Sequence, residues 1–151
     1  SGLRTDTGEK VMQSVTSARE QLSGLLDQLI DTIPGASHAL LASGDGLKMA
    51  WTHQSVDDAD TLAAMVAPLY SLCSRPFAEA DGGMRQIVAE HDAGYLFVMS
   101  AGASFTSVQA VGTVLAVVTT SDAIPGQAGH EMAQFIRGLD EHLVIDARNR
   151  S

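Results

Sequence analysis

The chain has 151 residues, 45% of them hydrophobic, and its nine basic and eighteen acidic residues give a formal net charge of −9. This length predicts about one domain with its own buried core, while the negative charge argues against nucleic acid and anionic membrane surfaces as partners. Because Cys73 is the sole cysteine and no run approaches the ~18 apolar residues that span a bilayer, we expect no intrachain disulfide, no direct membrane insertion and a cytoplasmic location.

The first predicted element is an amphipathic helix that ends at Ile33. Its apolar residues recur at spacings of three and four, which places them along one side of a helix. They are Val11, Val15, Ala18, Leu22, Leu25, Leu26, Leu29, Ile30 and Ile33. Pro34 and Gly35 predict a sharp stop, because proline cannot continue a helix and glycine accepts the dihedral angles of the exit.

A β-hairpin is predicted after this helix. The segment Ser37–Ser43 has apolar residues at adjacent positions, which predicts a central strand covered on both faces. The return strand, Leu47–Trp51, alternates between two faces, as expected nearer a sheet edge. One face carries Leu47, Met49 and Trp51, and the other carries Lys48 and Ala50. Between the strands, Gly44, Asp45 and Gly46 tolerate positive φ and predict a tight turn.

The second predicted helix begins between Ser55 and Asp58, where a hydroxyl or carboxylate can cap the first turn. Its apolar stripe consists of Leu62, Met65, Val66, Leu69, Tyr70 and Cys73. Pro68 predicts a bend, because inside a helix proline removes one hydrogen bond and clashes with the carbonyl four residues earlier. Arg75 and Pro76 predict the end of the segment.

Three more strands and a closing helix complete the predicted order, α-β-β-α-β-β-β-α. The strands are expected at Met84–His91, Tyr95–Ala101 and Thr113–Thr119. The connection from Gly102 to Gly112 is longer than a tight hairpin requires, which predicts a flexible loop or an extension of the flanking strands. Pro125 fits the first turn of the last helix, whose apolar period continues to Leu143.

Three segments resemble the start of catalytic motifs, and each lacks a residue that the chemistry needs. His130 opens a zinc-protease pattern, but Gln134 stands where the second histidine ligand belongs. Ser104 lacks the second glycine of a nucleophile elbow. The dinucleotide-like run from Gly44 has Met49 in place of its third glycine, and a predicted strand follows. We therefore predict no catalytic residue, no metal ligand and no cofactor.

The remaining polar groups have simpler interpretations than a functional site. The histidines, at positions 38, 53, 91, 130 and 142, are far apart in the sequence. Asp57, Asp58 and Asp60 lack the glycine and distal glutamate of a calcium loop, and the start of a helix explains them. Cys73 lies on an apolar stripe, where a buried, unreactive thiol is the ordinary case.

Taken together, these segments resemble bacterial members of the roadblock/dynein light chain family. The resemblance lies in Leu22–Ile30 leading into Ile33-Pro34-Gly35, then Ala39–Leu47, Ala63-Ala64, Arg85–Val88 and Glu131–Ala133. It covers most of the chain, and no single motif is diagnostic. It implies an α/β fold of the α+β type, a profilin-like roadblock fold. In this fold, a five-stranded antiparallel sheet has the first and last helices on one face and the second helix on the other.

The resemblance also implies how the chain divides and associates. We expect a single roadblock-like domain at residues 18–143, preceded by an extension, 1–17, that is partly helical or disordered, and followed by a polar tail, 144–151. A homodimer is expected in which third strands pair edge to edge and second helices pack together. The expected interface residues are Leu62, Met65, Val66, Leu69, Tyr70, Ile87 and Val88. The helix stripe among them could equally face its own sheet.

The function implied by the resemblance is regulation of a small Ras-like GTPase, as a non-enzymatic scaffold or as an activator of GTP hydrolysis. Such a module can position the GTPase's own residues and needs no catalytic site. Arg75 and Arg85 are candidates for an arginine finger, although interpretation as surface or edge-strand charges is preferred for both. A small-molecule-sensing α/β domain is the alternative and would need an interior pocket. A hydrolase, ranked third, would need His38 or His91 to reach a serine or carboxylate.

Overall fold

The computed structural model describes residues 18–101 and 113–149, with side chains described as far as residue 139. The strands are β1 (Ala36–Ala42), β2 (Lys48–Thr52), β3 (Gln86–His91), β4 (Gly94–Ser100) and β5 (Val114–Thr120). The helices are the first helix, whose described part covers residues 18–32, then α2 (Val56–Ser74), the short 3-10 helix η1 (Arg75–Phe77) and α3 (Pro125–Asn149). The predicted order of elements is confirmed.

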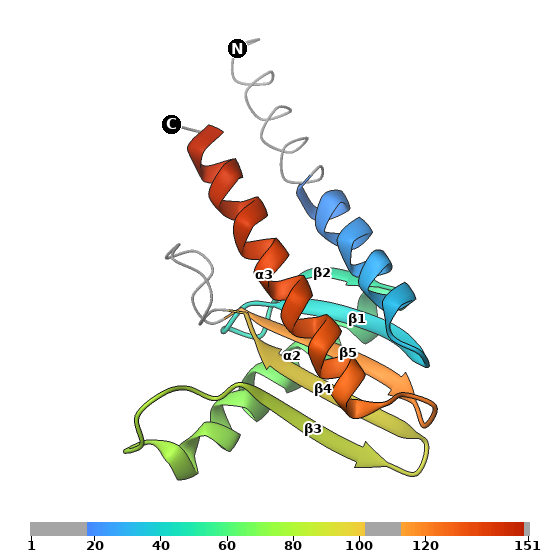
Figure 1. Cartoon of the computed structure of the whole chain (residues 1–151), viewed down its shortest axis with the longest axis vertical. Coiled ribbons are helices and arrows are strands. Elements are labelled where there is room, and N and C mark those ends of the chain that lie inside the picture. Colours follow the sequence, from blue (N-terminus) through green and yellow to red (C-terminus); the bar gives the residue numbers. More distant parts are fainter. Residues whose placement is uncertain (1–17, 102–112, 150–151) are drawn as a thin grey trace.

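The five strands form one antiparallel sheet in the order β2-β1-β5-β4-β3. The first helix and α3 cross one face of this sheet, and α2 lies on the other (Figure 1). This is the arrangement that the family resemblance implies. As predicted, β1 is an inner strand and β2 is an edge strand.

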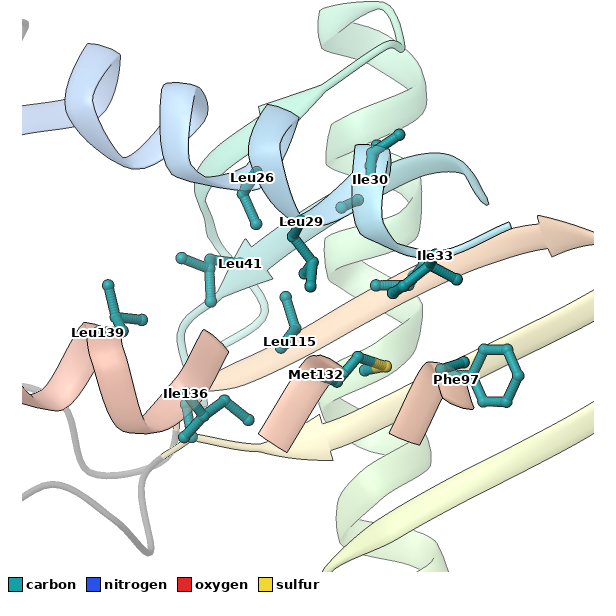
Figure 2. Close-up of a cluster of buried hydrophobic side chains, with 14 of the residues drawn as sticks. Leu26, Leu29, Ile30, Ile33, Leu41, Phe97, Leu115, Met132, Ile136 and Leu139 are labelled. Carbon is teal, nitrogen blue, oxygen red and sulfur yellow. The ribbon is translucent and has the colours of Figure 1, made fainter. Parts of the chain in front are cut away.

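The face below the first helix and α3 holds a core of large side chains (Figure 2). The predicted stripe of the first helix supplies Leu26, Leu29, Ile30 and Ile33, all buried. The sheet and α3 supply Leu41, Phe97, Leu115, Met132, Ile136 and Leu139. Each such side chain stabilises the fold by about 1.5–3 kcal/mol when it is fully buried. Val11 and Val15 of the predicted stripe lie outside the described residues.

The face below α2 is built from smaller side chains. From the helix, Ala59, Ala63 and Val66 are completely buried. They pack against Leu40, Ala42, Val98, Val114 and Ala116 of the sheet. Because alanine adds little bulk, the backbone of α2 can lie close to the strands, and Leu62, Leu69 and Tyr70 pack at the margin of this core.

Strand β2 differs from its predicted alternation. Ala50 is buried with the large core, whereas Trp51 packs only partly, against the α2 side. Leu47 precedes the strand and is 67% exposed. Ala50 and Trp51 thus lie on opposite faces, as predicted, whereas Met49 packs against the same core as Ala50, because the β1–β2 register shifts beside it.

The ends of two helices can be compared with the sequence-based expectation. Helix α2 runs through Pro68, where the bend stays a prediction, and ends at Ser74, directly before Arg75 and Pro76 as predicted. The last helix continues to Asn149, past Leu143, so residues 144–149 extend it. The expected connection from Gly102 to Gly112 and the expected extension 1–17 lie outside the described residues.

Candidate interaction surface

One flank of α2 carries a row of large apolar side chains that are exposed or only partly buried. We call this row the outer face of α2; it consists of Leu62, Met65, Leu69 and Leu72. Their spacing of three, four and three places them on one side of the helix. Met65 is 48% exposed and Leu72 is 52% exposed, whereas Leu62 and Leu69 are partly buried. Large apolar side chains this exposed are candidates for contact with another protein.

The predicted stripe of α2 is in fact divided between two directions. Val66 is completely buried in the core of its own subunit, so the structure removes it from the expected interface. Tyr70 is partly buried, and its hydroxyl donates a hydrogen bond to the carbonyl of Met84. Cys73 is also only partly buried, so the expected buried thiol is wrong: it lies at the margin of the stripe.

Strand β3 lies at the edge of the sheet nearest to the end of α2. Within the described residues, one side of β3 has no strand beside it, so its backbone groups on that side are free to pair. Ile87 pairs with Val98 and lies partly buried on the α2 side of the sheet. Val88 pairs with Phe97 on the opposite side and is 43% exposed.

Sequence reasoning missed two exposed residues near this edge, Leu72 and Phe77. Phe77 belongs to η1 and is 64% exposed, beside a groove of about 460 Å³ between the end of α2 and the segment leading to Met84. The signal for Leu72 was present in the sequence, because it continues the three-and-four spacing from Leu69. No periodic signal points to Phe77, which lies beyond the end of the helix.

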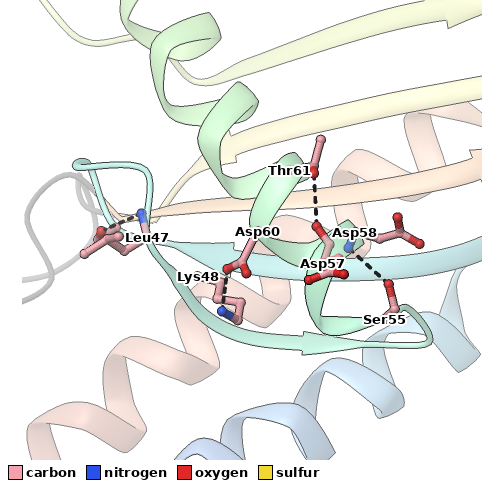
Figure 3. A network of polar contacts seen from close by, with 8 residues as sticks. Leu47, Lys48, Ser55, Asp57, Asp58, Asp60 and Thr61 are labelled. Atoms are coloured by element: carbon pink, nitrogen blue, oxygen red, sulfur yellow. Dashed lines mark hydrogen bonds and ion pairs between the residues drawn. The ribbon is translucent and has the colours of Figure 1, made fainter.

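The start of α2 is a polar cluster that serves the helix itself (Figure 3). The hydroxyl of Ser55 accepts a hydrogen bond of 3.1 Å from the backbone N–H of Asp58, which caps the helix as predicted. Asp60 forms an ion pair with Lys48. The described part of the chain contains no group of three or more His, Cys, Asp or Glu residues that could hold a metal ion.

The two histidines named for a hydrolase lie on different strands. His38 is on inner strand β1 and His91 is at the end of edge strand β3, with β5 and β4 between them. Nδ1 of His91 accepts a hydrogen bond of 2.9 Å from the N–H of Ala93, so this ring nitrogen is engaged within the β3–β4 turn. Burial lowers the pKa of His38, an effect that Asp58 opposes and His53 reinforces.

A surface groove of about 380 Å³ runs between the first helix and α3. Its apolar lining includes Leu25, Leu29, Phe135 and Leu139, and exposed polar side chains form its rim. Because this groove lies on the surface, it does not supply the interior pocket that a ligand-sensing domain requires.

The sequence model of the Roadblock/LC7 domain matches residues 22–119. The chain belongs to the Roadblock/LC7 family. It is thereby a domain of a regulatory, protein-binding class associated with GTPase control. No curated protein sequence matches the chain significantly. Among the described residues, no helix combines the length and hydrophobicity needed to cross a membrane.

Solved structures support the family and the fold. The Roadblock/LC7 domain from Streptomyces avermitilis is 32% identical, with a TM-score of 0.71 over 81% of this chain and 97% of that one. MglB from Myxococcus xanthus is 14% identical, with a TM-score of 0.69 over 82% of this chain and 88% of that one. Profilin IA from Acanthamoeba castellanii, at 13% identity, has a TM-score of 0.55 over 80% of this chain and 97% of that one. The last two show the fold alone, a profilin-like one.

Proposed function

We propose that this Roadblock/LC7 domain is a homodimeric regulator that binds a small Ras-like GTPase. Two surface features on one side of the molecule support the proposed dimer. The outer face of α2 exposes Met65 and Leu72 to solvent, and β3 has an unpaired backbone edge. A second copy placed on this side would cover both.

The geometry gives each proposed interface residue a distinct role. Edge-to-edge pairing of two β3 strands would satisfy their free N–H and C=O groups and join the two sheets. Ile87, on the α2 side of β3, would then lie beside the packed outer faces of α2, and Val88 would contribute from the opposite side. Leu62, Met65, Leu69 and Tyr70 remain in the proposed interface, joined by Leu72.

The proposed action on the GTPase is positioning. Phosphoryl transfer depends mainly on orientation and on stabilising charge, so a bound module can change the hydrolysis rate by holding the GTPase's own residues in place. The family assignment fits such a role. A net charge of −9 favours a partner with a basic surface. The proposed site of action is the cytoplasm.

The test has two stages, since the GTPase must first be found. The purified protein is used as bait in lysate of its source cells, with GDP and with a non-hydrolysable GTP analogue, and retained GTPases are purified individually. Each is then assayed for single-turnover GTP hydrolysis with and without the protein. Nucleotide-dependent binding together with a changed hydrolysis rate supports regulation. Binding with an unchanged rate of GTP hydrolysis reduces the proposed role to that of a scaffold. If no GTPase is retained with either nucleotide, the proposal is contradicted.

The dimer is tested with the same protein by measuring its mass in solution. Leu72→Asp places a charge on the outer face of α2 and is expected to shift the mass toward that of a monomer. Ile124→Asp is the matched control, because Ile124 is 59% exposed in the loop before α3, away from this face. A monomeric mass for the wild-type protein would overturn the proposed dimer. The GTPase assay would still test the regulatory part of the proposal.

A further inference from the structure

A notch of about 350 Å³ lies on the other flank of α2. The turn Gly44–Gly46 between β1 and β2 forms one wall, and Ala64, Ala67, Pro68 and Ser71 of α2 form the other. We call this the turn notch. Helical geometry places its α2 residues and the outer face of α2 on the two sides of the stripe that faces the sheet. A partner can therefore reach the turn notch while the outer face is covered.

The turn wall of the notch is preformed. The N–H of Gly46 donates to the carbonyl of Ser43 at 3.0 Å, and the N–H of Ser43 donates to the carbonyl of Leu47 at 2.9 Å. The N–H of Leu47 also donates to the hydroxyl of Ser43 at 3.3 Å (Figure 3). Gly46 has φ +83°, and a Cβ there would come within 3.6 Å of the carbonyl oxygen of Ala63. The turn thus rests directly on the helix.

Three groups on the residues that line the notch can accept a hydrogen bond. Pro68 has no N–H, so the carbonyl of Ala64, four residues earlier, lacks its normal helical donor. Asp45 brings a carboxylate and Ser71 a hydroxyl. No lysine or arginine within residues 18–101 and 113–139 forms an ion pair with Asp45. The carboxylate and the carbonyl match a ligand that carries hydrogen-bond donors and a positive charge.

We propose that the turn notch receives an arginine or lysine side chain of a protein partner. Leu47 is 67% exposed on the same rigid turn and supplies the apolar contact for the stem of that side chain. The inference rests on the proposed function for its partner, a Ras-like GTPase, whose basic residue would complement the acidic chain. The turn notch is distinct from the dimer interface and adds a second binding surface to the domain.

The notch is tested without any partner by a small probe. The ¹⁵N-labelled protein is titrated with N-acetyl-arginine amide and with its neutral isostere N-acetyl-citrulline amide, and backbone amide shifts are followed by NMR. The arginine probe is expected to shift the amides of residues 44–47 and Ser71 in a saturable manner, and citrulline is not. Asp45→Asn should weaken binding of the arginine probe by about fivefold, because it removes one exposed ion pair.

The matched control is Asp92→Asn, which removes the same charge from the exposed β3–β4 turn. It should leave arginine binding at the notch unchanged. Two results would overturn the proposed notch by showing a non-specific charge effect. One is a set of amide shifts spread over the acidic surface without saturation, and the other is an equal weakening of arginine binding by Asp45→Asn and Asp92→Asn.

The partner is tested with the GTPase found by the capture experiment. Asp45→Asn should weaken that complex by about fivefold while the mass of the free protein stays that of wild type. Unchanged affinity for the GTPase would overturn the assignment of this partner to the notch. If no GTPase is found, the proposed function fails, and the arginine titration still decides whether the notch binds a basic side chain.

Discussion

The two faces of the sheet use side chains of different size. Below the first helix and α3, the buried residues are large, among them Leu26, Phe97 and Met132. Below α2 the helix contributes only Ala59, Ala63 and Val66 at full burial; Leu62 and Leu69 pack there in part, and Met65 and Leu72 are exposed. The first face uses its apolar area to stabilise the fold. The second uses small residues for close approach and leaves Met65 and Leu72 exposed.

In the function proposed above, this difference would let α2 take part in recognition without loss of the fold. Hydrophobic stabilisation scales with the apolar area removed from water, so the large core holds most of it. The outer face of α2 and the turn notch lie on a helix that adds less to that core. Changes on these surfaces should therefore alter binding more than stability, whereas changes below the first helix should do the reverse.

The largest effect is expected from Phe97→Ala in the large core. Removing this ring should lower the free energy of unfolding by about 3–5 kcal/mol, because it leaves a cavity between the sheet and α3. Val66→Ala in the α2 face should lower it by about 1–2 kcal/mol, since fewer carbon atoms are lost. Chemical denaturation of both variants provides the comparison. Equal losses would show that the two faces stabilise the fold equally.

A larger side chain under α2 should have the next effect. Ala63→Leu overpacks a position with no exposed surface and should lower the free energy of unfolding by about 1–3 kcal/mol. The control is Ala64→Leu, whose neighbouring position is exposed and should change stability by less than about 0.5 kcal/mol. If Ala63→Leu is neutral, close approach of α2 to the sheet is not required.

Substitutions on the proposed interface should change stability less and association more. Leu72→Asp should alter the free energy of unfolding of the subunit by less than about 0.5 kcal/mol, because the side chain is half exposed. It should nevertheless move the mass measured by light scattering toward the monomer. Ile87→Asp should do the same with some loss of stability, since Ile87 is partly buried. An unchanged mass for both variants would remove α2 and β3 from the interface.

Much of the fold could be predicted from the sequence, because periodicity and turn residues act locally. The helix stop after Ile33, the turn Gly44–Gly46 and the cap at Ser55 are where the sequence indicates. It is harder to predict which apolar residues of α2 face its own sheet and which are exposed. A stripe of apolar residues indicates that one side of a helix is covered, but it does not identify the covering element. The sequence therefore does not distinguish buried Val66 from exposed Met65. Their directions depend on the alanines at 59 and 63, which bring the helix onto its own sheet.

The smallest predicted effect concerns pH. Burial lowers the pKa of His38 below its ordinary value of 6.5, and His53 adds to this while Asp58 opposes it. The unfolded chain then binds more protons than the folded chain just below pH 6.5, so this contribution to stability is complete above that pH and is lost on acidification. His38→Gln should flatten the fall in the free energy of unfolding below pH 6.5, measured by denaturation at several pH values. His130→Gln removes a histidine while leaving His38 in place, and an equal flattening in that control would contradict the assignment of the effect to His38.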